Sequence, residues 1–204
     1  MQKSINKHPY TYDKDRGPYL NTWSGISFHL LTPSPEEVLL EDIAHHLAFQ
    51  RRSVGAIIRD YSIAQHSLLV CVLVIKELIR QGSYTTAEIN YIAMQALLHD
   101  AEEYVTGDVP KPLKTLIAPI LDPIAKEIKR IIGIKLGYDL INMPPEIKHA
   151  DNIAMATEKA QLYKPSKVKW HKLPKPDTNI IPPMTSLEAE AAFLKRFHEL
   201  ASIV

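Results

Sequence analysis

The ten residues from His99 to Asp108 place an imidazole beside a carboxylate and a further acid, Glu103, four residues after the histidine. An imidazole next to a carboxylate offers the ligands that a borderline divalent metal ion binds. A nearby acid that is not a ligand can carry out the proton transfer that a metal-bound water requires. Because a His-Asp dipeptide is usually a helix cap or a surface pair, the segment needs partners elsewhere in the chain.

Two further residues could complete such a metal site. His66 lies near the start of an apolar segment, and Asp151 lies near the start of a later one. Each has an ordinary alternative, since His66 could be a satisfied core histidine and Asp151 a helix cap. Burying either side chain unpaired would be costly, which favours a shared role. With His99 and Asp100 they supply two imidazoles and two carboxylates, enough to hold one metal ion in a helical bundle.

The segments that carry these residues resemble a known family. YSIAQHS at 61–67, LLHDAEEYVTGDVP at 97–110 and ADNIAMATEK at 150–159 are similar to motifs of the HD-domain phosphohydrolases. The similarity is strongest to the bacterial HD-domain 5'-nucleotidases and their phage relatives, and a weaker one covers LEDIAHHLAFQR at 40–51. The resemblance spans residues 36–160 and implies a metal-dependent phosphohydrolase that acts on nucleotides.

The resemblance also implies which residues hold the metal. His66, His99, Asp100 and Asp151 would ligate one divalent transition metal ion, which could be Mn, Fe, Co, Ni or Zn. HD enzymes with two metals use further histidines between the HD pair and the last aspartate. Here the only such histidine is His149, two residues before Asp151, which would point elsewhere on a helix. One catalytic metal is therefore expected.

Catalytic and substrate-binding roles follow from the same resemblance. Glu103 matches the acid that orients the nucleophilic water or protonates the leaving oxygen. Asp108 matches the carboxylate that closes the site and contacts the sugar hydroxyl. Arg51 lies fifteen residues before His66, where the family places a phosphate-binding arginine, although it could also be a solvated residue at a helix end. Its planar guanidinium suits two phosphate oxygens.

The residue after that arginine departs from the family. The nucleotidases carry a tryptophan there that helps to choose the nucleotide, whereas this chain has Arg52. An extra cation suggests room for more phosphate charge, to which Lys111 and Lys114 could add, although solvated lysines are the commoner case.

Three functions remain open on this evidence. The first is hydrolysis of a nucleoside 5'-monophosphate to nucleoside and phosphate. The second is a deoxynucleoside triphosphohydrolase, acting for example on dATP and releasing triphosphate. The third is a nucleotide-binding HD module without turnover.

Composition limits the partners and the cellular location that the protein can have. The chain of 204 residues carries a formal net charge of +1, which does not favour nucleic acid or an anionic membrane as a partner. Its single cysteine, Cys71, excludes an internal disulfide and lies in an apolar run at 68–75 that is too short to cross a bilayer. The first residues lack the apolar core of a signal peptide, so a cytoplasmic protein is expected. The resemblance alone suggests a homo-oligomer such as a dimer.

Helical periodicity predicts an all-α chain, and the resemblance implies that it forms one HD-domain bundle over residues 1–204. We expect an irregular N-terminal arm at 1–35, with a possible short hairpin around Ser24-Gly25, and a helical core at 36–163 that holds the metal site. A loop rich in proline and lysine at 164–183 would precede a C-terminal helix at 184–204. Helices are expected at 36–50, 62–79, 86–103, 123–136 and 145–163, with prolines breaking the chain before the fourth, and a last helix follows at the C-terminus. Ser34 is expected to cap the first helix and Ser186 the last.

Overall fold

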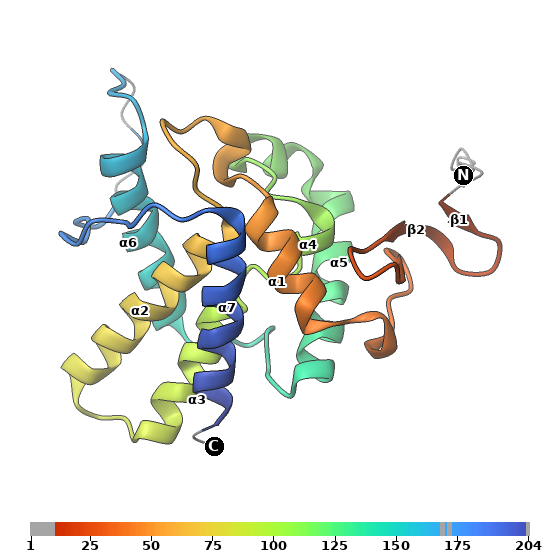
Figure 1. Cartoon of the computed structure of the whole chain (residues 1–204), viewed down its shortest axis with the longest axis horizontal. Helices are drawn as coiled ribbons and strands as arrows, with labels where there is room; N and C mark the ends of the chain where they lie inside the picture. The colour runs from red at the N-terminus through yellow and green to blue at the C-terminus, as the bar shows by residue number, and fades with distance from the viewer. Residues whose placement is uncertain (1–10, 168–169, 171–172, 203–204) are drawn as a thin grey trace.

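The computed structural model describes residues 11–167, 170 and 173–202, and this part of the chain is mainly helical (Figure 1). The α-helices are α1 (Leu40–Phe49), α2 (Ile63–Gln81), α3 (Thr86–Leu97), α4 (Glu103–Thr106), α5 (Lys111–Leu136), α6 (Pro145–Leu162) and α7 (Ser186–Ala201). Two 3-10 turns, η1 (Pro35–Glu37) and η2 (Arg52–Gly55), flank α1. The predicted helical bundle is therefore confirmed.

A small antiparallel sheet forms the N-terminal arm, which the sequence analysis expected to be irregular. Its strands are β1 (Tyr12–Asp13), β2 (Gly17–Asn21) and β3 (Ser27–His29), in the order β1-β2-β3. The hairpin expected around Ser24-Gly25 joins β2 to β3, with Asn21 opposite Ser27. Gly25 has a φ of +85°, which favours glycine at this tight turn. Figure 1 shows the sheet extending to one side of the helices.

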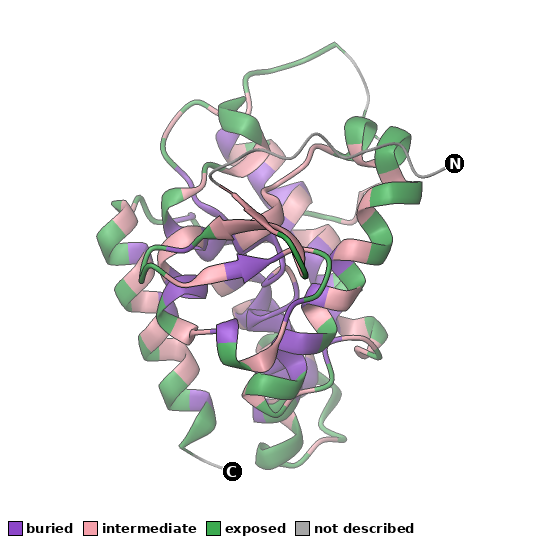
Figure 2. Ribbon diagram, turned by 90° about the vertical axis from the view of Figure 1, so that its right-hand side faces the viewer, coloured by how far each residue is buried: buried purple, intermediate pink, exposed green. Residues whose placement is uncertain are grey.

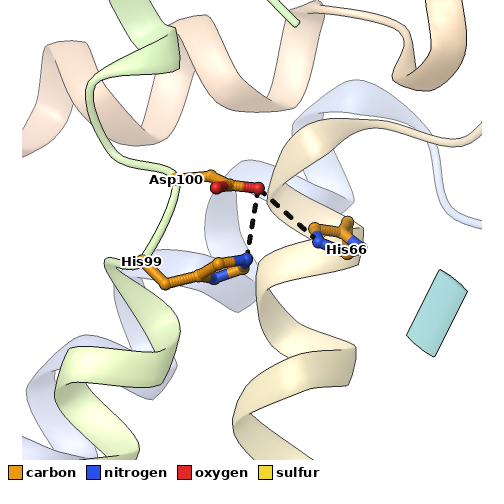
Figure 3. A group of neighbouring side chains, drawn as sticks. All are labelled: His66, His99 and Asp100. Carbon is orange, nitrogen blue, oxygen red and sulfur yellow. Dashed lines mark ion pairs between the residues drawn. The ribbon is translucent and has the colours of Figure 1, made fainter. Parts of the chain in front are cut away.

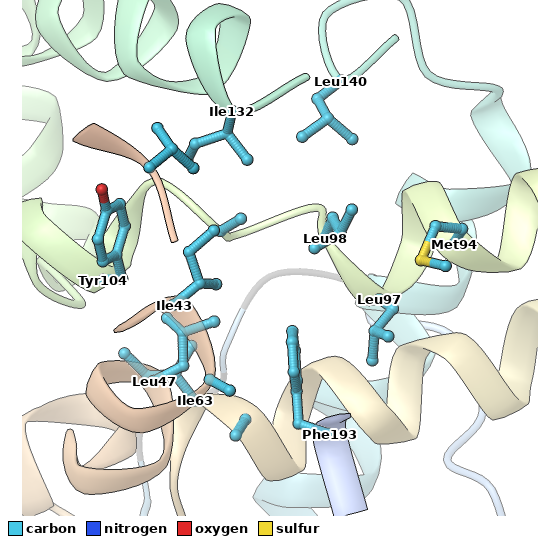
Figure 4. Close-up of a cluster of buried hydrophobic side chains, with 14 of the residues drawn as sticks. Ile43, Leu47, Ile63, Met94, Leu97, Leu98, Tyr104, Ile132, Leu140 and Phe193 are labelled. Carbon is cyan, nitrogen blue, oxygen red and sulfur yellow. The ribbon is translucent and has the colours of Figure 1, made fainter. Parts of the chain in front are cut away.

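Helix α2 is the centre of the bundle and packs against α1, α3, α6 and α7. Ser62 starts it with a capping box in which the Ser62 hydroxyl and the Gln65 side chain each bond the other's backbone N–H. The core beside α2 consists of large aliphatic and aromatic side chains (Figure 4), and Figure 2 shows burial concentrated between the helices. Its members include Ile43, Leu47, Ile63, Leu97, Leu98, Ile132 and Phe193. Truncating one of them to alanine would cost about 2–5 kcal/mol of stability.

The prediction that one helix runs from 86 to 103 was wrong. Helix α3 ends at Leu97, because Leu98 (φ −99°, ψ 6°) leaves helical geometry and the chain turns until α4 begins at Glu103. His99 Nδ1 lies 2.8 Å from the Ala96 carbonyl oxygen, which holds the turn against the helix end. His99 and Asp100 are therefore placed by a turn, so their side chains can converge on α2.

Three smaller predictions also differ from the structure. Helix α5 is continuous through Pro119 and Pro123, both of which are exposed, so water can satisfy the carbonyls that lose a partner. Thr185, not Ser186, caps α7, and Ser34 makes no side-chain cap bond. Separately, none of the helices that the structure describes is long and apolar enough to cross a membrane.

Candidate metal centre

Two histidines and an aspartate meet where the start of α2 faces the turn after α3 (Figure 3). One ligand atom from each of His66, His99 and Asp100 lies within 4.8 Å of the other two. Asp100 Oδ2 is 3.1 Å from His99 Nε2 and 3.6 Å from His66 Nε2. The structure thus brings together three of the four predicted metal ligands in one cluster, whose two histidines are buried.

Asp151, the fourth predicted ligand, approaches the cluster from α6. Its Oδ1 lies 3.3 Å from His66 Nε2, while its Oδ2 accepts a 2.6 Å hydrogen bond from Lys148. Asp151 is buried on the second turn of α6, so helix geometry and not a flexible loop fixes its position. The four predicted ligands therefore lie together, with His99 close to Asp100, and with Asp100 and Asp151 both close to His66 Nε2.

The unpaired atoms of this cluster fit a metal ion. His99 Nε2 is buried and has no hydrogen-bond partner among the described residues, and the nearby Asp100 Oδ2 lies 3.1 Å from it. The Nδ1 atoms of His66 and His99 are both occupied, by Glu158 and by the Ala96 carbonyl. Such bonds at Nδ1 are typical of metal-binding histidines, because they leave Nε2 free to ligate.

Electrostatics at the cluster favour positive charge at its centre. Burial and Arg52 would each lower the pKa of His66, but Glu158 and Asp151 outweigh them and raise that pKa to about 10. Burial would raise the pKa of Asp100, yet the histidines and Arg52 hold it well below the ordinary value. The carboxylates thus stay ionised around a point where a divalent ion would supply the balancing charge.

Glu103 begins α4 beside the cluster and behaves as a different kind of acid. Burial, Asp100 and Asp108 together raise its pKa to about 9, so it carries a proton at neutral pH. Its Oε2 is buried without a partner in the described chain, and its Oε1 lies 3.9 Å from Lys114 Nζ. A buried protonated carboxyl next to a metal site can act as a general acid.

The structure separates the two adjacent arginines. Arg51 points outward, with a side chain that is 41% exposed and 3.3 Å from Asp60, and its role in binding phosphate stays a prediction. Arg52 is 13% exposed and points inward, with Nη2 3.3 Å from His66 Nε2. Because the chain is extended at Arg51 (φ −84°, ψ 129°) and pairs with Ser62, successive side chains face opposite sides.

The predicted sugar contact, Asp108, is engaged with the same turn. Its Oδ1 lies 3.3 Å from Arg52 Nη1, and its Oδ2 accepts a 2.7 Å hydrogen bond from the Ser53 N–H. Asp108 therefore anchors the turn that carries Arg52. Lys114 borders the site through Glu103, whereas Lys111 is exposed on the first turn of α5.

Two residues at the site, the buried Glu158 and the partly buried Lys129, were missed by the sequence analysis. Glu158 Oε1 lies 2.6 Å from His66 Nδ1 and 3.0 Å from the Tyr61 hydroxyl. Lys129 of α5 forms a 3.0 Å ion pair with Glu102 and donates to the His99 carbonyl. The sequence held a signal for Glu158, which follows Asp151 by seven residues and so lies two turns along the same face of α6.

Comparison with known proteins is consistent with this site. The family described as 5'-deoxynucleotidase YfbR-like matches residues 42–162, which include all four predicted metal ligands. The YfdR protein of Escherichia coli K12 is 29% identical over 91% of this chain and 97% of its own length. A Rhodobacter capsulatus protein, RCAP_rcc00048, is 34% identical over 87% of this chain and 92% of its own. A 5'-deoxynucleotidase of Pectobacterium atrosepticum is 37% identical over 44% of this chain and 43% of its own.

The family match covers more than half of the chain, and the motifs that it includes are those that build the cluster. Two observations thus both indicate a hydrolase: the chain has a His-His-Asp group that could bind a metal ion, and it matches a family of hydrolases. This chain belongs to the YfbR-like 5'-deoxynucleotidase family and is an enzyme of the HD-domain phosphohydrolase type.

Proposed function

We propose that this enzyme hydrolyses nucleoside 5'-monophosphates, with deoxynucleotides as the first candidates, to nucleoside and phosphate. The observation that carries the proposal is a partly buried cation, Arg52, directly beside the group formed by His66, His99 and Asp100. A phosphoryl group could then contact a metal and a guanidinium at once. Relatives named 5'-deoxynucleotidases support the choice of substrate.

The residues of the chain divide the work of this reaction. Lewis-acid activation of a water and of a phosphoryl oxygen is the chemistry that a divalent metal held by the four ligands would supply. Arg52 binds phosphoryl oxygens and offsets their charge. Glu103, protonated at neutral pH, donates a proton to the leaving 5' oxygen. Asp108 keeps Arg52 in place through its Oδ1.

Charge balance favours a monophosphate over a triphosphate. Arg52 is an extra cation relative to the family, but its guanidinium lies 3.3 Å from Asp108, 3.7 Å from Glu158 and 4.0 Å from Asp100. These acids compensate its charge, so little excess positive potential remains for two more phosphates. Of the two lysines expected to bind additional phosphate, Lys114 lies near Glu103. Because it could bind further phosphate groups, triphosphohydrolase activity is kept as the second candidate.

Turnover of a nucleotide panel tests the proposal. The purified protein is stripped of metal, reloaded in turn with Mn, Co, Ni, Zn or Fe, and given deoxynucleoside and ribonucleoside 5'-mono- and triphosphates. Release of free phosphate and nucleoside from monophosphates supports the proposal. Release of triphosphate alone identifies the second candidate, and no turnover with any metal contradicts both.

The setting of the enzyme is part of the same proposal. A single buried cysteine, Cys71, suits a reducing cytoplasmic location. A homo-oligomer remains a prediction from the family, and the solution mass of the protein measured by light scattering tests it. Neither nucleic acid nor a membrane is proposed as a partner.

A further inference from the structure

The side chain of Glu158 lies between a predicted metal ligand, His66, and the proposed phosphate-binding residue, Arg52. We propose that Glu158 is a positioning residue that fixes both at once, and so couples metal affinity to phosphate binding. The part that concerns phosphate rests on the proposed function, whereas the part that concerns the metal stands on geometry alone.

The contact with His66 sets the orientation of the imidazole. Glu158 Oε1 lies 2.6 Å from His66 Nδ1, and both side chains are almost wholly buried. A carboxylate can only accept at this position, so Nδ1 carries a hydrogen and Nε2 faces Asp100 and Asp151. Partners of this kind orient the ring and raise its basicity, and their loss typically weakens metal affinity by about 10–100-fold.

The negative charge of Glu158 also attracts the Arg52 guanidinium, which lies close to the metal ligands. Glu158 Oε2 lies 3.7 Å from Arg52 Nε, a buried atom with no hydrogen-bond partner in the described chain. The Nη atoms of Arg52 lie 3.3 Å from His66 Nε2 and 4.0 Å from Asp100 Oδ2. Without Glu158, the attraction of Asp100 would draw Arg52 toward the position that a metal needs.

Tyr61 holds Glu158 in its place. The Tyr61 hydroxyl is buried and donates a 3.0 Å hydrogen bond to Glu158 Oε1, the same oxygen that faces His66. Tyr61 directly precedes Ser62, the cap of α2, so the start of α2 positions both the histidine and the side chain that supports it. Glu158 is thus fixed from three sides, by Tyr61, His66 and Arg52.

Variants at Glu158 separate the two contacts. Glu158→Ala removes both and is expected to weaken metal binding by about 10–100-fold, measured by competition with a chelator. In Glu158→Gln the amide oxygen can still accept from His66, but the negative charge beside Arg52 is lost. This variant is expected to keep metal affinity within a few-fold while raising KM for a nucleoside monophosphate more than it lowers kcat.

Two controls guard against a general loss of structure. Glu37→Gln changes another buried glutamate that contacts a histidine and an arginine, and it should alter neither metal affinity nor KM. Glu158→Asp keeps the charge but withdraws the carboxylate by one carbon, and it should weaken metal binding even if Glu158→Ala does not fold. A folded Glu158→Ala or Glu158→Asp protein with wild-type metal affinity overturns the proposal. If no nucleotide is hydrolysed, metal affinity still decides the role of Glu158, so the two proposals fail separately.

Discussion

Two buried glutamates in this molecule make nearly the same contacts in different places. In η1, next to the N-terminal arm, Glu37 Oε1 lies 2.9 Å from His29 Nδ1 and pairs with Arg16. In α6, Glu158 Oε1 lies 2.6 Å from the Nδ1 of a histidine, His66, and its Oε2 faces Arg52. Both trios combine one acid, one imidazole and one guanidinium, but only the second lies in a candidate metal centre.

The difference lies in what remains unpaired. Around Glu37 the polar groups bond to one another. The second oxygen of Glu37 accepts a hydrogen bond from the His29 backbone N–H, and Arg16 also donates to the Thr32 carbonyl. Around the metal centre several buried atoms lack a hydrogen-bond partner within the described residues, namely His99 Nε2, Glu102 Oε2, Glu103 Oε2 and Arg52 Nε. A closed trio fastens two segments together, whereas an open one leaves atoms available to a ligand.

The largest effect should come from removing a ligand of the open site. Asp100→Ala is expected to abolish stoichiometric metal binding and to lower phosphatase activity by more than about a thousand-fold, because metal and water activation are lost together. Metal content by mass spectrometry and phosphate release check this. Glu37→Ala, the matched change in the closed trio, should leave metal content unchanged, and a metal-loaded, active Asp100→Ala enzyme would contradict the assignment.

Glu103 should give the next largest effect, and its pH dependence has a definite sign. Glu103→Gln is expected to keep metal but to lower kcat by about 10²–10⁴-fold. The pKa of Glu103 is about 9 in the folded protein against 4.5 for the ordinary group, so between these values the folded state binds more protons. The carboxyl therefore destabilises the fold as pH rises through that range.

Denaturant unfolding of the metal-stripped proteins measures this effect. Glu103→Gln should be more stable than the wild type near pH 8, and the difference should disappear as pH falls below about 4.5, where the wild-type carboxyl is protonated in both states. A difference that is constant across this range would show that the pKa of Glu103 is not raised.

Much of this site could be predicted from sequence. The resemblance of three short motifs to those of the HD-domain phosphohydrolases grouped His66, the HD pair and Asp151 from distant segments. The helices were found where apolar periodicity was uninterrupted, as in α2 and α6. The family resemblance supplied the rest of the ligand assignment.

What could not be predicted depends on local geometry and on long-range partners. The turn after Leu97 breaks a periodic apolar pattern without a glycine or proline to mark it. Which of Arg51 and Arg52 faces inward depends on how the chain leaves α1, since one residue of extended chain reverses the side. Glu158 was not singled out, because its partner, His66, is 92 residues away in sequence.

The two arginines provide a test of intermediate size. Arg52→Lys keeps a positive charge but loses the planar fork, and it is expected to raise KM for a nucleoside monophosphate by about 10-fold or more, since two-point binding of phosphate is lost. Arg51→Lys, at the exposed neighbour, should change KM by less than about two-fold. Steady-state kinetics of the two variants test which arginine binds phosphate, and the reverse order of effects would support Arg51 as the phosphate-binding residue.

The smallest effect on activity should come from the closed trio, where the expected change is in stability. Burial opposes ionisation of Glu37, but bonds from the His29 N–H, Arg16 and the His29 ring outweigh it and hold the pKa of Glu37 below the ordinary 4.5. Wild type should therefore exceed Glu37→Gln in unfolding free energy by about 1–3 kcal/mol above pH 4.5, an advantage lost as pH falls through the folded pKa. Parallel urea titrations at several pH values measure it, with turnover as the second readout. A large loss of turnover in a stably folded Glu37→Gln protein would mean that Glu37 and its partners take part in the reaction, and the contrast between a structural and a functional glutamate would fail.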